Sequence, residues 1–485
     1  MNVRRGLTAL GVLLVIAAIW LGVSATGYPR ALAPMQDAPR AIQIDNVRVV
    51  SMAPGAAQAV DAQSVLVVDG VIAAAGDTGT IIVPDDLKAE EVIHIDGGGK
   101  TLMPGLVDAH VHVWDEAELA GYLVHGVTGV RNMSGMPFHL PLQQRIEDGR
   151  ILGPDFITTG PILNSPGHNQ QDNHQIVATA QEARAAVAKQ DEAGYRALKV
   201  YSNLYSDAYD AVMEEAAARG MSVSGHTPEG VREDGVPYDK PFDIPFEASL
   251  GRGFTTIEHV ESIVWHGLRD ELDDIAMRDL AEKIAMSGEA VTPTLIAHDN
   301  LVRVANSRGE YLNRPGTDTI NPLYKMLDQG IYDFWSAMDP TPRETPRAAF
   351  YLKATKVLHD AGVTLVAGTD AGIFTNIPGS AMTRELELLV KAGLTPYEAL
   401  QTATVNAGEV LGFEKTGVIA PGYRANMILV EGDPLEDVSF VENPSAVMIG
   451  GKWLDADKLA DLRKGAAQTS IPRTARRAIA MLRDL

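Results

Sequence analysis

The chain has 485 residues, of which 46% are hydrophobic and 21% charged, the composition of a globular protein with more than one structural unit. Acidic residues number 63 against 41 basic ones, and the formal net charge of -22 argues against a sequence-independent grip on nucleic acid. There are no cysteines, so disulfides and Cys-based zinc sites are excluded, and any transition metal must be held by His and carboxylates.

The first 28 residues have the pattern of an export signal. Arg4 and Arg5 precede an uncharged run over residues 7–23, and small residues follow at a suitable cleavage point. The run is long for a signal core and short for a spanning helix, so residues 1–28 are predicted to be either a cleaved signal peptide or a retained membrane anchor. A buried N-terminal helix is the alternative. Basic residues before the run would place the rest of the chain outside the cytoplasm, in the periplasm or anchored facing outward.

Residues 41–100 alternate apolar and polar side chains in short runs broken by Gly, Asp and Pro, which predicts strands and turns without a helix. From Thr101 onward, short apolar strands alternate with helical segments, as in a parallel sheet. The eight strand segments counted here are LMPGLVDAHVHV, GVTGVRNM, DFITTGPILN, RALKVYS, MSVSGHT, FTTIEHV, AVTPTLIA and VTLVAGTDAG. We therefore predict an α/β fold in which residues 101–415 form a (β/α)8 TIM barrel.

After the predicted barrel, residues 416–465 again have the sequence pattern of short strands. Two strand-rich flanks around one barrel predict a single β-sandwich domain, assembled from residues 41–100 and 416–465. The last fourteen residues carry four arginines, and we interpret this segment as a solvated surface helix or tail.

Histidines and a carboxylate fall where the predicted barrel strands end. His110 and His112 are two residues apart in a strand, so both side chains point the same way, into the barrel mouth. Neutral imidazoles together with a carboxylate suit a metal such as Zn²⁺. A lysine inside a strand facing this centre is unfavourable as an ammonium; a carbamate would make it an anionic bridge, and pairing with a local carboxylate is the alternative. The later candidates are Lys199, His226, His259 and Asp370.

These motifs together resemble one family of enzymes. The segments MPGLVDAHVHV, GVTGVR, LKVY, GHT, IEHVES and GTDAG occur in this order, and over residues 41–465 the chain is similar to the amidohydrolase superfamily. It looks most like its branch of imidazolonepropionase-related enzymes and Xaa-Pro or other metal dipeptidases.

The resemblance implies a binuclear centre. His110, His112 and Asp370 would hold one divalent ion, His226 and His259 the other, and a CO2-derived carbamate on Lys199 would bridge two ions that we expect to be Zn²⁺. A metal-bound hydroxide would be the nucleophile. Asp370 would be catalytic, taking the proton of the hydroxide and passing it to the leaving nitrogen.

Three further side chains are candidates for substrate binding. His168 lies in the SPGHN loop after the third strand, where relatives place a Gly-His near the substrate, and its alternative is an ordinary loop histidine. Tyr201 and Tyr205 follow Lys199 closely enough to line the pocket, with core packing as the alternative.

The predicted function is hydrolysis of an amide C–N bond in a dipeptide-like or N-acyl amino acid substrate by an exported enzyme. Cyclic amides or lactams and esters are alternative substrates, and a mononuclear deaminase-like enzyme would not need Lys199. Outside the enzymes, a membrane-anchored binding or scaffold protein with the same fold is a further alternative. The expected partner is a small-molecule substrate, with no nucleic acid, and a homo-oligomer is compatible with the sequence.

Overall fold

The computed structural model describes residues 22, 24–35, 39–84, 87–88, 91–231 and 242–484. The apolar run of the predicted leader, residues 7–23, falls outside the described residues except for Gly22. Within the described ranges, no helix is both long and apolar enough to cross a membrane.

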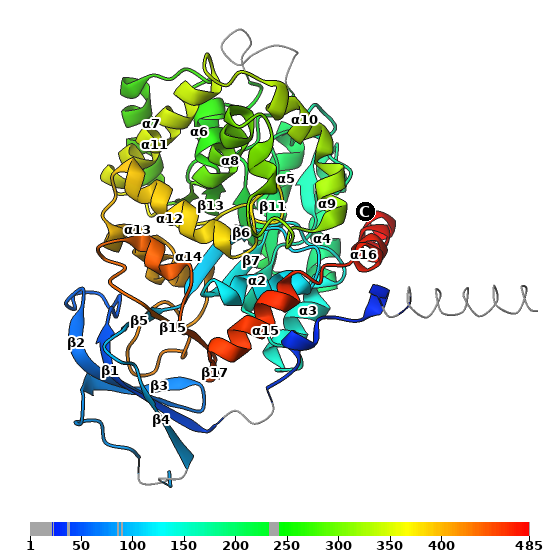
Figure 1. The fold of residues 1–485 in the computed structure, drawn as a ribbon. Coiled ribbons are helices and arrows are strands. Elements are labelled where there is room, and N and C mark those ends of the chain that lie inside the picture. The colour runs from blue at the N-terminus through cyan, green and yellow to red at the C-terminus, as the bar shows by residue number, and fades with distance from the viewer. Residues whose placement is uncertain are drawn as a thin grey trace, which may run out of the picture.

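Both ends of the chain contribute to one eight-stranded sheet, seen in blue and orange at the base of the molecule (Figure 1). β15 pairs antiparallel with β5, which joins the C-terminal strands to the N-terminal ones. The order is β17-β16-β15-β5-β1-β2-β3, and β4 also pairs with β1. The strands are β1 (Ala41–Val49), β2 (Val60–Val68), β3 (Val71–Asp77), β4 (Val92–Asp96), β5 (Thr101–Pro104), β15 (Met427–Val430), β16 (Ala446–Ile449) and β17 (Lys452–Leu454).

The central part of the chain alternates strands with helices, and its strands pair in parallel in two sheets, β6-β7-β8 and β10-β9-β11-β12-β13-β14. An α/β fold with parallel strands is therefore present. These strands are β6 (Leu106–Val111), β7 (Val127–Asn132), β8 (Asp155–Thr158), β9 (Ile162–Asn164), β10 (His174–Ile176), β11 (Ala197–Val200), β12 (Ser222–Gly225), β13 (Phe254–Glu258) and β14 (Ala290–Thr292).

The predicted eighth strand is not a regular strand. In place of it, residues 363–371 make two isolated parallel bridges, from Leu365 to Val291 of β14 and from Ala371 to Val111 of β6. The segment thus lies between the last and the first strand of the series. Asp370 has a left-handed backbone (φ 57°), which interrupts the extended conformation at the point where the side chain is needed.

The predicted first barrel strand, LMPGLVDAHVHV, is divided at Gly105. Residues before it form β5 of the eight-stranded sheet, and residues after it form β6. A Cβ at Gly105 would lie 2.3 Å from the Thr128 hydroxyl, so the chain can pass β7 here only without a side chain.

Helices cover the parallel strands (Figure 1). α4 shows how the sequence sets their limits: the Thr179 hydroxyl accepts from the backbone N–H of Glu182, and Gly194 ends the helix with a left-handed backbone. The helices are α2 (Ala117–Val124), α3 (His139–Glu147), α4 (Ala180–Ala193), α5 (Ser206–Arg219), α6 (Val260–Gly267), α7 (Asp274–Ser287), α8 (Leu295–Asn306), α9 (Pro322–Leu327), α10 (Gln329–Ala337), α11 (Glu344–Asp360), α12 (Ser380–Ala392), α13 (Pro396–Thr402), α14 (Val405–Leu411), α15 (Ala456–Ala466) and α16 (Ile471–Asp484).

Candidate active site

All six predicted ligands lie at or near the carboxyl ends of the parallel strands, which meet at one rim because the strands run the same way. Five of them are buried and His226 is half-buried. His110 and His112 come from the end of β6, Lys199 from β11, His226 and His259 follow β12 and β13, and Asp370 lies in the bridging segment 363–371.

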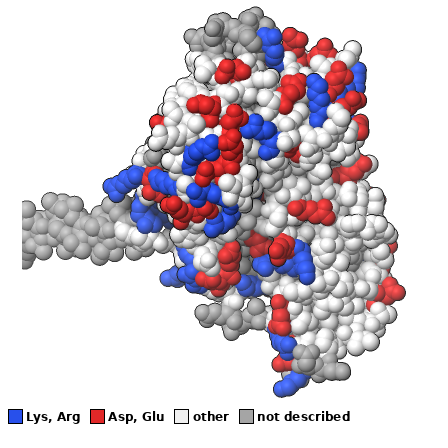
Figure 2. Space-filling model, turned by 180° about the vertical axis from the view of Figure 1, so that it is seen from behind, with Lys and Arg blue, Asp and Glu red and all other residues white. Residues whose placement is uncertain are grey.

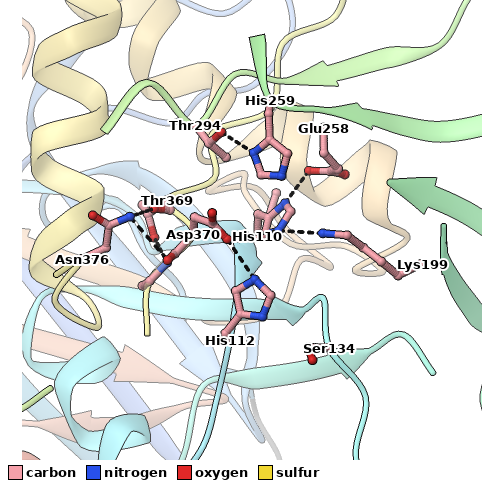
Figure 3. Close-up of polar contacts among 12 residues, drawn as sticks. His110, His112, Ser134, Lys199, Glu258, His259, Thr294, Thr369, Asp370 and Asn376 are labelled. Atoms are coloured by element: carbon pink, nitrogen blue, oxygen red, sulfur yellow. Dashed lines mark hydrogen bonds and ion pairs between the residues drawn. The ribbon is translucent and has the colours of Figure 1, made fainter. Parts of the chain in front are cut away.

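His110, His112 and Asp370 form the tightest group (Figure 3). The Asp370 carboxylate oxygen Oδ1 lies 2.9 Å from His112 Nε2 and 3.3 Å from His110 Nε2. One ligand atom from each residue lies within 4.8 Å of the others. Burial opposes ionisation of Asp370, but the neighbouring His110 and His112 outweigh it and hold the pKa of this carboxyl well below its usual range. The trio thus offers two imidazoles and an ionised carboxylate to one point.

A buried carboxylate orients His110. Glu258 Oε2 lies 2.6 Å from His110 Nδ1, and its other oxygen accepts from Arg131 Nη2 at 2.7 Å. Arg131 is itself held by a hydrogen bond of 2.6 Å from its Nε to the Ala109 carbonyl. Burial raises the pKa of Glu258, but Arg131 and His110 lower it further, so the carboxylate is ionised. An Nδ1–H donated to this carboxylate leaves the lone pair of Nε2 facing Asp370 and Lys199.

The second pair of histidines is oriented by hydroxyl groups. His226 Nδ1 lies 3.0 Å from Ser262 Oγ, and His259 Nδ1 lies 2.6 Å from Thr294 Oγ1. The ring centroids of the two histidines are 4.6 Å apart. Burial lowers the pKa of both imidazoles, to about 4 for His259, so both are neutral at physiological pH. With Nδ1 engaged, each ring has Nε2 available for a metal.

Lys199 reaches this centre from β11 and contacts His110. Its Nζ is 3.0 Å from His110 Nε2, and the side chain is 1% exposed. Burial lowers the pKa of this amine to about 8, although Glu258 and Asp370 act in the opposite direction. Among the described residues, the polar partner of Lys199 within hydrogen-bond distance is His110 and not a carboxylate. An amine that is partly uncharged near neutral pH can react with CO2.

The amidohydrolase family profile matches residues 101–454, which is more than half of the chain. This chain belongs to the amidohydrolase family. The resemblance predicted from its motifs is confirmed, and so is its assignment as an enzyme of this family.

Relatives of this amidohydrolase share about a quarter of its sequence. An ochratoxinase of Aspergillus niger is 23% identical, over 71% of this chain and 73% of its own length. Among solved structures, a bottromycin amidohydrolase matches with a TM-score of 0.70 and 24% identity, covering 93% of this chain and 96% of its own. A Xaa-Pro dipeptidase with bound methionine in its active site matches with a TM-score of 0.63 and 20% identity, covering 86% and 100%. These structures support the fold.

The three predicted substrate residues are not in one place in this amidohydrolase. The Tyr201 ring lies 4.1 Å from the ring of His226, measured between centroids, so this tyrosine is brought to the metal-ligand candidates. His168 is exposed and lines, with Tyr205, a separate cavity of about 270 Å³ whose described lining includes none of the six ligand candidates. The Tyr205 hydroxyl donates to the Pro166 carbonyl at 3.1 Å.

The donor set fits divalent metals. Three of the histidines have Nδ1 held by a neighbour and Nε2 left available, and the ionised carboxylate of Asp370 lies against two of the four rings. Two residues that the sequence reasoning missed, Glu258 and Arg131, complete this arrangement. Their signal in the sequence is a charged residue inside each of two otherwise buried strands, VTGVRN and FTTIE.

Proposed function

We propose that this chain is an exported, binuclear metal-dependent amidohydrolase that cleaves the amide C–N bond of a dipeptide-like or N-acyl amino acid substrate. The observation that carries the proposal is a buried centre in which three imidazoles oriented through Nδ1 lie together with His112, Asp370 and Lys199. In three of the four histidines a partner on Nδ1 leaves Nε2 available, which a cluster held only by packing would not require.

In this proposal each residue has one task. His110, His112 and Asp370 would hold one ion, His226 and His259 would hold the other, and a carbamate on Lys199 would supply an anionic ligand to both. Bound Zn²⁺ would supply a water of lowered pKa and polarise the scissile carbonyl. The Asp370 carboxylate takes the proton of the attacking water and returns it to the departing nitrogen, whose basicity rises as the C–N bond breaks. Tyr201, beside His226, contacts the bound substrate.

We also propose a closed barrel, a composite β-sandwich domain and export from the cytoplasm. The two bridges of residues 363–371 support closure of the parallel strands into a (β/α)8 barrel. The pairing of β15 with β5 supports a composite domain made from residues 41–100 and 416–465. The arginines and apolar run of residues 1–28 support export, with the leader cleaved or retained as an anchor.

A screen of the zinc-loaded protein against dipeptides, N-acyl amino acids, lactams and esters tests the activity. We expect turnover of a dipeptide or N-acyl amino acid, about two metal ions per chain, and loss of activity on chelation and in His110→Ala. Turnover confined to lactams or esters would contradict the substrate class. Full activity in the metal-stripped protein would contradict the whole mechanism.

A further inference from the structure

The C-terminal helix α16 has two different faces. Its inner face carries two buried arginines: Arg473 donates to Asp115 at 2.5 and 2.8 Å, and Arg477 pairs with Glu116 and donates to the Trp114 carbonyl at 3.0 Å. Their exposed fractions are 5% and 4%, so the prediction that the C-terminal arginines are all solvated is wrong for these two. The reason is the pair of acids that directly follows Trp114, which the sequence alone did not connect to this helix.

The outer face of α16 carries an exposed apolar stripe. Ile471, Ile479 and Leu482 are 44%, 52% and 57% exposed. At 3.6 residues per turn these positions fall on one side of the helix, opposite Arg473 and Arg477. Arg476 and Arg483 are exposed along one edge of the stripe. An apolar strip with flanking arginines is the pattern of a helix that lies in a membrane interface.

This stripe lies where the chain emerges from its apolar leader. The hydroxyl of Ser470, the residue before α16, donates to the carbonyl of Ser24 at 2.8 Å, and Arg473 donates to the carbonyl of Gly27 at 2.8 Å. The first described residues and α16 lie side by side (Figure 1). Ser24 directly follows the uncharged run 7–23. If that run stays in a bilayer, the start of α16 is therefore held at the bilayer surface.

We propose that the outer stripe of α16, formed by Ile471, Ile479 and Leu482, docks onto the surface of the lipid bilayer in which residues 7–23 are anchored. The inference rests on the anchored form of the proposed function. Charge supports a lipid partner: the whole chain carries a formal charge of -22, yet the exposed charged residues of α16 are two arginines, Arg476 and Arg483, and one acid, Asp484. Seen from behind, Lys and Arg side chains lie at this edge of the molecule with Asp and Glu among them (Figure 2). Docking would fix the orientation of the enzyme on the membrane.

The absence of cysteine from the natural sequence makes a direct test possible. The full chain with Leu482→Cys, labelled with a fluorophore, is reconstituted into vesicles of phosphatidylethanolamine and phosphatidylglycerol containing a nitroxide-labelled lipid. The matched control is Ile275→Cys on α7, whose native side chain is 65% exposed on the opposite side of the molecule (Figure 1). We expect quenching at position 482 to exceed that at position 275 by about fivefold, because an interfacial helix buries its apolar face among the lipids.

A second variant separates the charge from the apolar contact. Adding Arg476→Gln and Arg483→Gln should reduce quenching at position 482 in these vesicles and have less effect in phosphatidylcholine vesicles. Equal quenching at positions 482 and 275 in chains that float with the vesicles would overturn the docking proposal and leave the anchor standing. Chains that do not float would overturn both. Cross-linking between two chains at position 482, without quenching, would assign the stripe to a second copy and also overturn the proposal.

Discussion

The two halves of the candidate metal centre are built differently. His110 is held by a carboxylate at 2.6 Å, and that carboxylate is held in turn by a buried arginine. His226 and His259 are held by the hydroxyls of Ser262 and Thr294. Hydrogen bonds to an ionised partner are about twice as strong as neutral ones. His110 is therefore held more firmly than His226 and His259, and we expect its half of the centre, the carboxylate-held half, to bind its metal more tightly.

This contrast predicts the order in which metals leave. A chelator should first remove the ion held by His226 and His259 and only later the ion held by His110, His112 and Asp370. Lys199 lies against His110, and in the proposed centre its carbamate would be the link through which loss of the first ion weakens the second.

The largest effect is expected at Asp370. Asp370→Asn keeps the size of the side chain but removes the charge that lies against His110 and His112. We expect kcat to fall by about 1,000-fold or more, because both a ligand and the proton acceptor are lost. Steady-state kinetics on the substrate found by the screen, with metal content measured in parallel, checks this. A variant that retains a tenth of the activity with both metals bound would contradict the role of Asp370.

Substitution of Glu258 tests whether its hydrogen bond to His110 strengthens metal binding in the carboxylate-held half. Glu258→Ala should weaken metal binding by about 10- to 100-fold, the usual effect of removing a partner that orients a ligand. Glu258→Gln can still accept the His110 N–H and should lose less. Zn²⁺ affinity measured by chelator competition gives the readout, and circular dichroism controls for folding, since Arg131 would lose its partner. Equal losses in the two variants would mean that charge and not orientation is what matters.

The part of this site that the sequence predicts follows from the regular geometry of parallel β-strands. Residues two apart in a strand share a face, and parallel strands end at one rim, so the sequence alone places His110, His112, His226 and His259 together. Glu258 was missed because its contact with His110 joins residues 148 positions apart, and no local pattern records such a pairing. His168 was predicted from its motif to bind substrate; its side chain is exposed and lines a separate cavity, whose described lining includes none of the ligand candidates.

The irregular segments of the fold were the least predictable. The apolar pattern of VTLVAGTDAG suggests a strand, whereas the structure has two isolated bridges there. The strand is interrupted by tertiary contacts and not by local sequence. A Cβ at Gly368 would lie 2.5 Å from Thr292 and 2.9 Å from the His110 side chain, and Asp370 has a left-handed backbone with φ 57°. How closely two segments approach depends on the side chains of the neighbouring strand. The pattern of apolar residues along one strand carries no information about those neighbours.

Lys199 should give metal loading a pH dependence. Because its pKa is lowered to about 8, the uncharged fraction that reacts with CO2 rises as pH rises through this value. Between pH 6.5 and 8.5, at constant dissolved CO2, this fraction grows on the order of 20-fold. We expect recovery of activity by the metal-free protein to speed up accordingly. His259, with a pKa of about 4, stays neutral over the whole range and adds nothing. A rate independent of pH would contradict a carbamate on Lys199.

The smallest effects are expected in the hydroxyl-held half. Ser262→Ala and Thr294→Val each remove one neutral hydrogen bond to a ligand imidazole, so we expect metal affinity to fall by less than about tenfold. Thr294→Ser keeps the hydroxyl and should behave like the native chain. The loss should be confined to one of the two metal ions, which a stepwise chelator titration resolves, while Glu258→Ala should affect the other. If Ser262→Ala weakened both ions equally, the two halves would be one coupled unit, because the carbamate of Lys199 would transmit every local change across the centre.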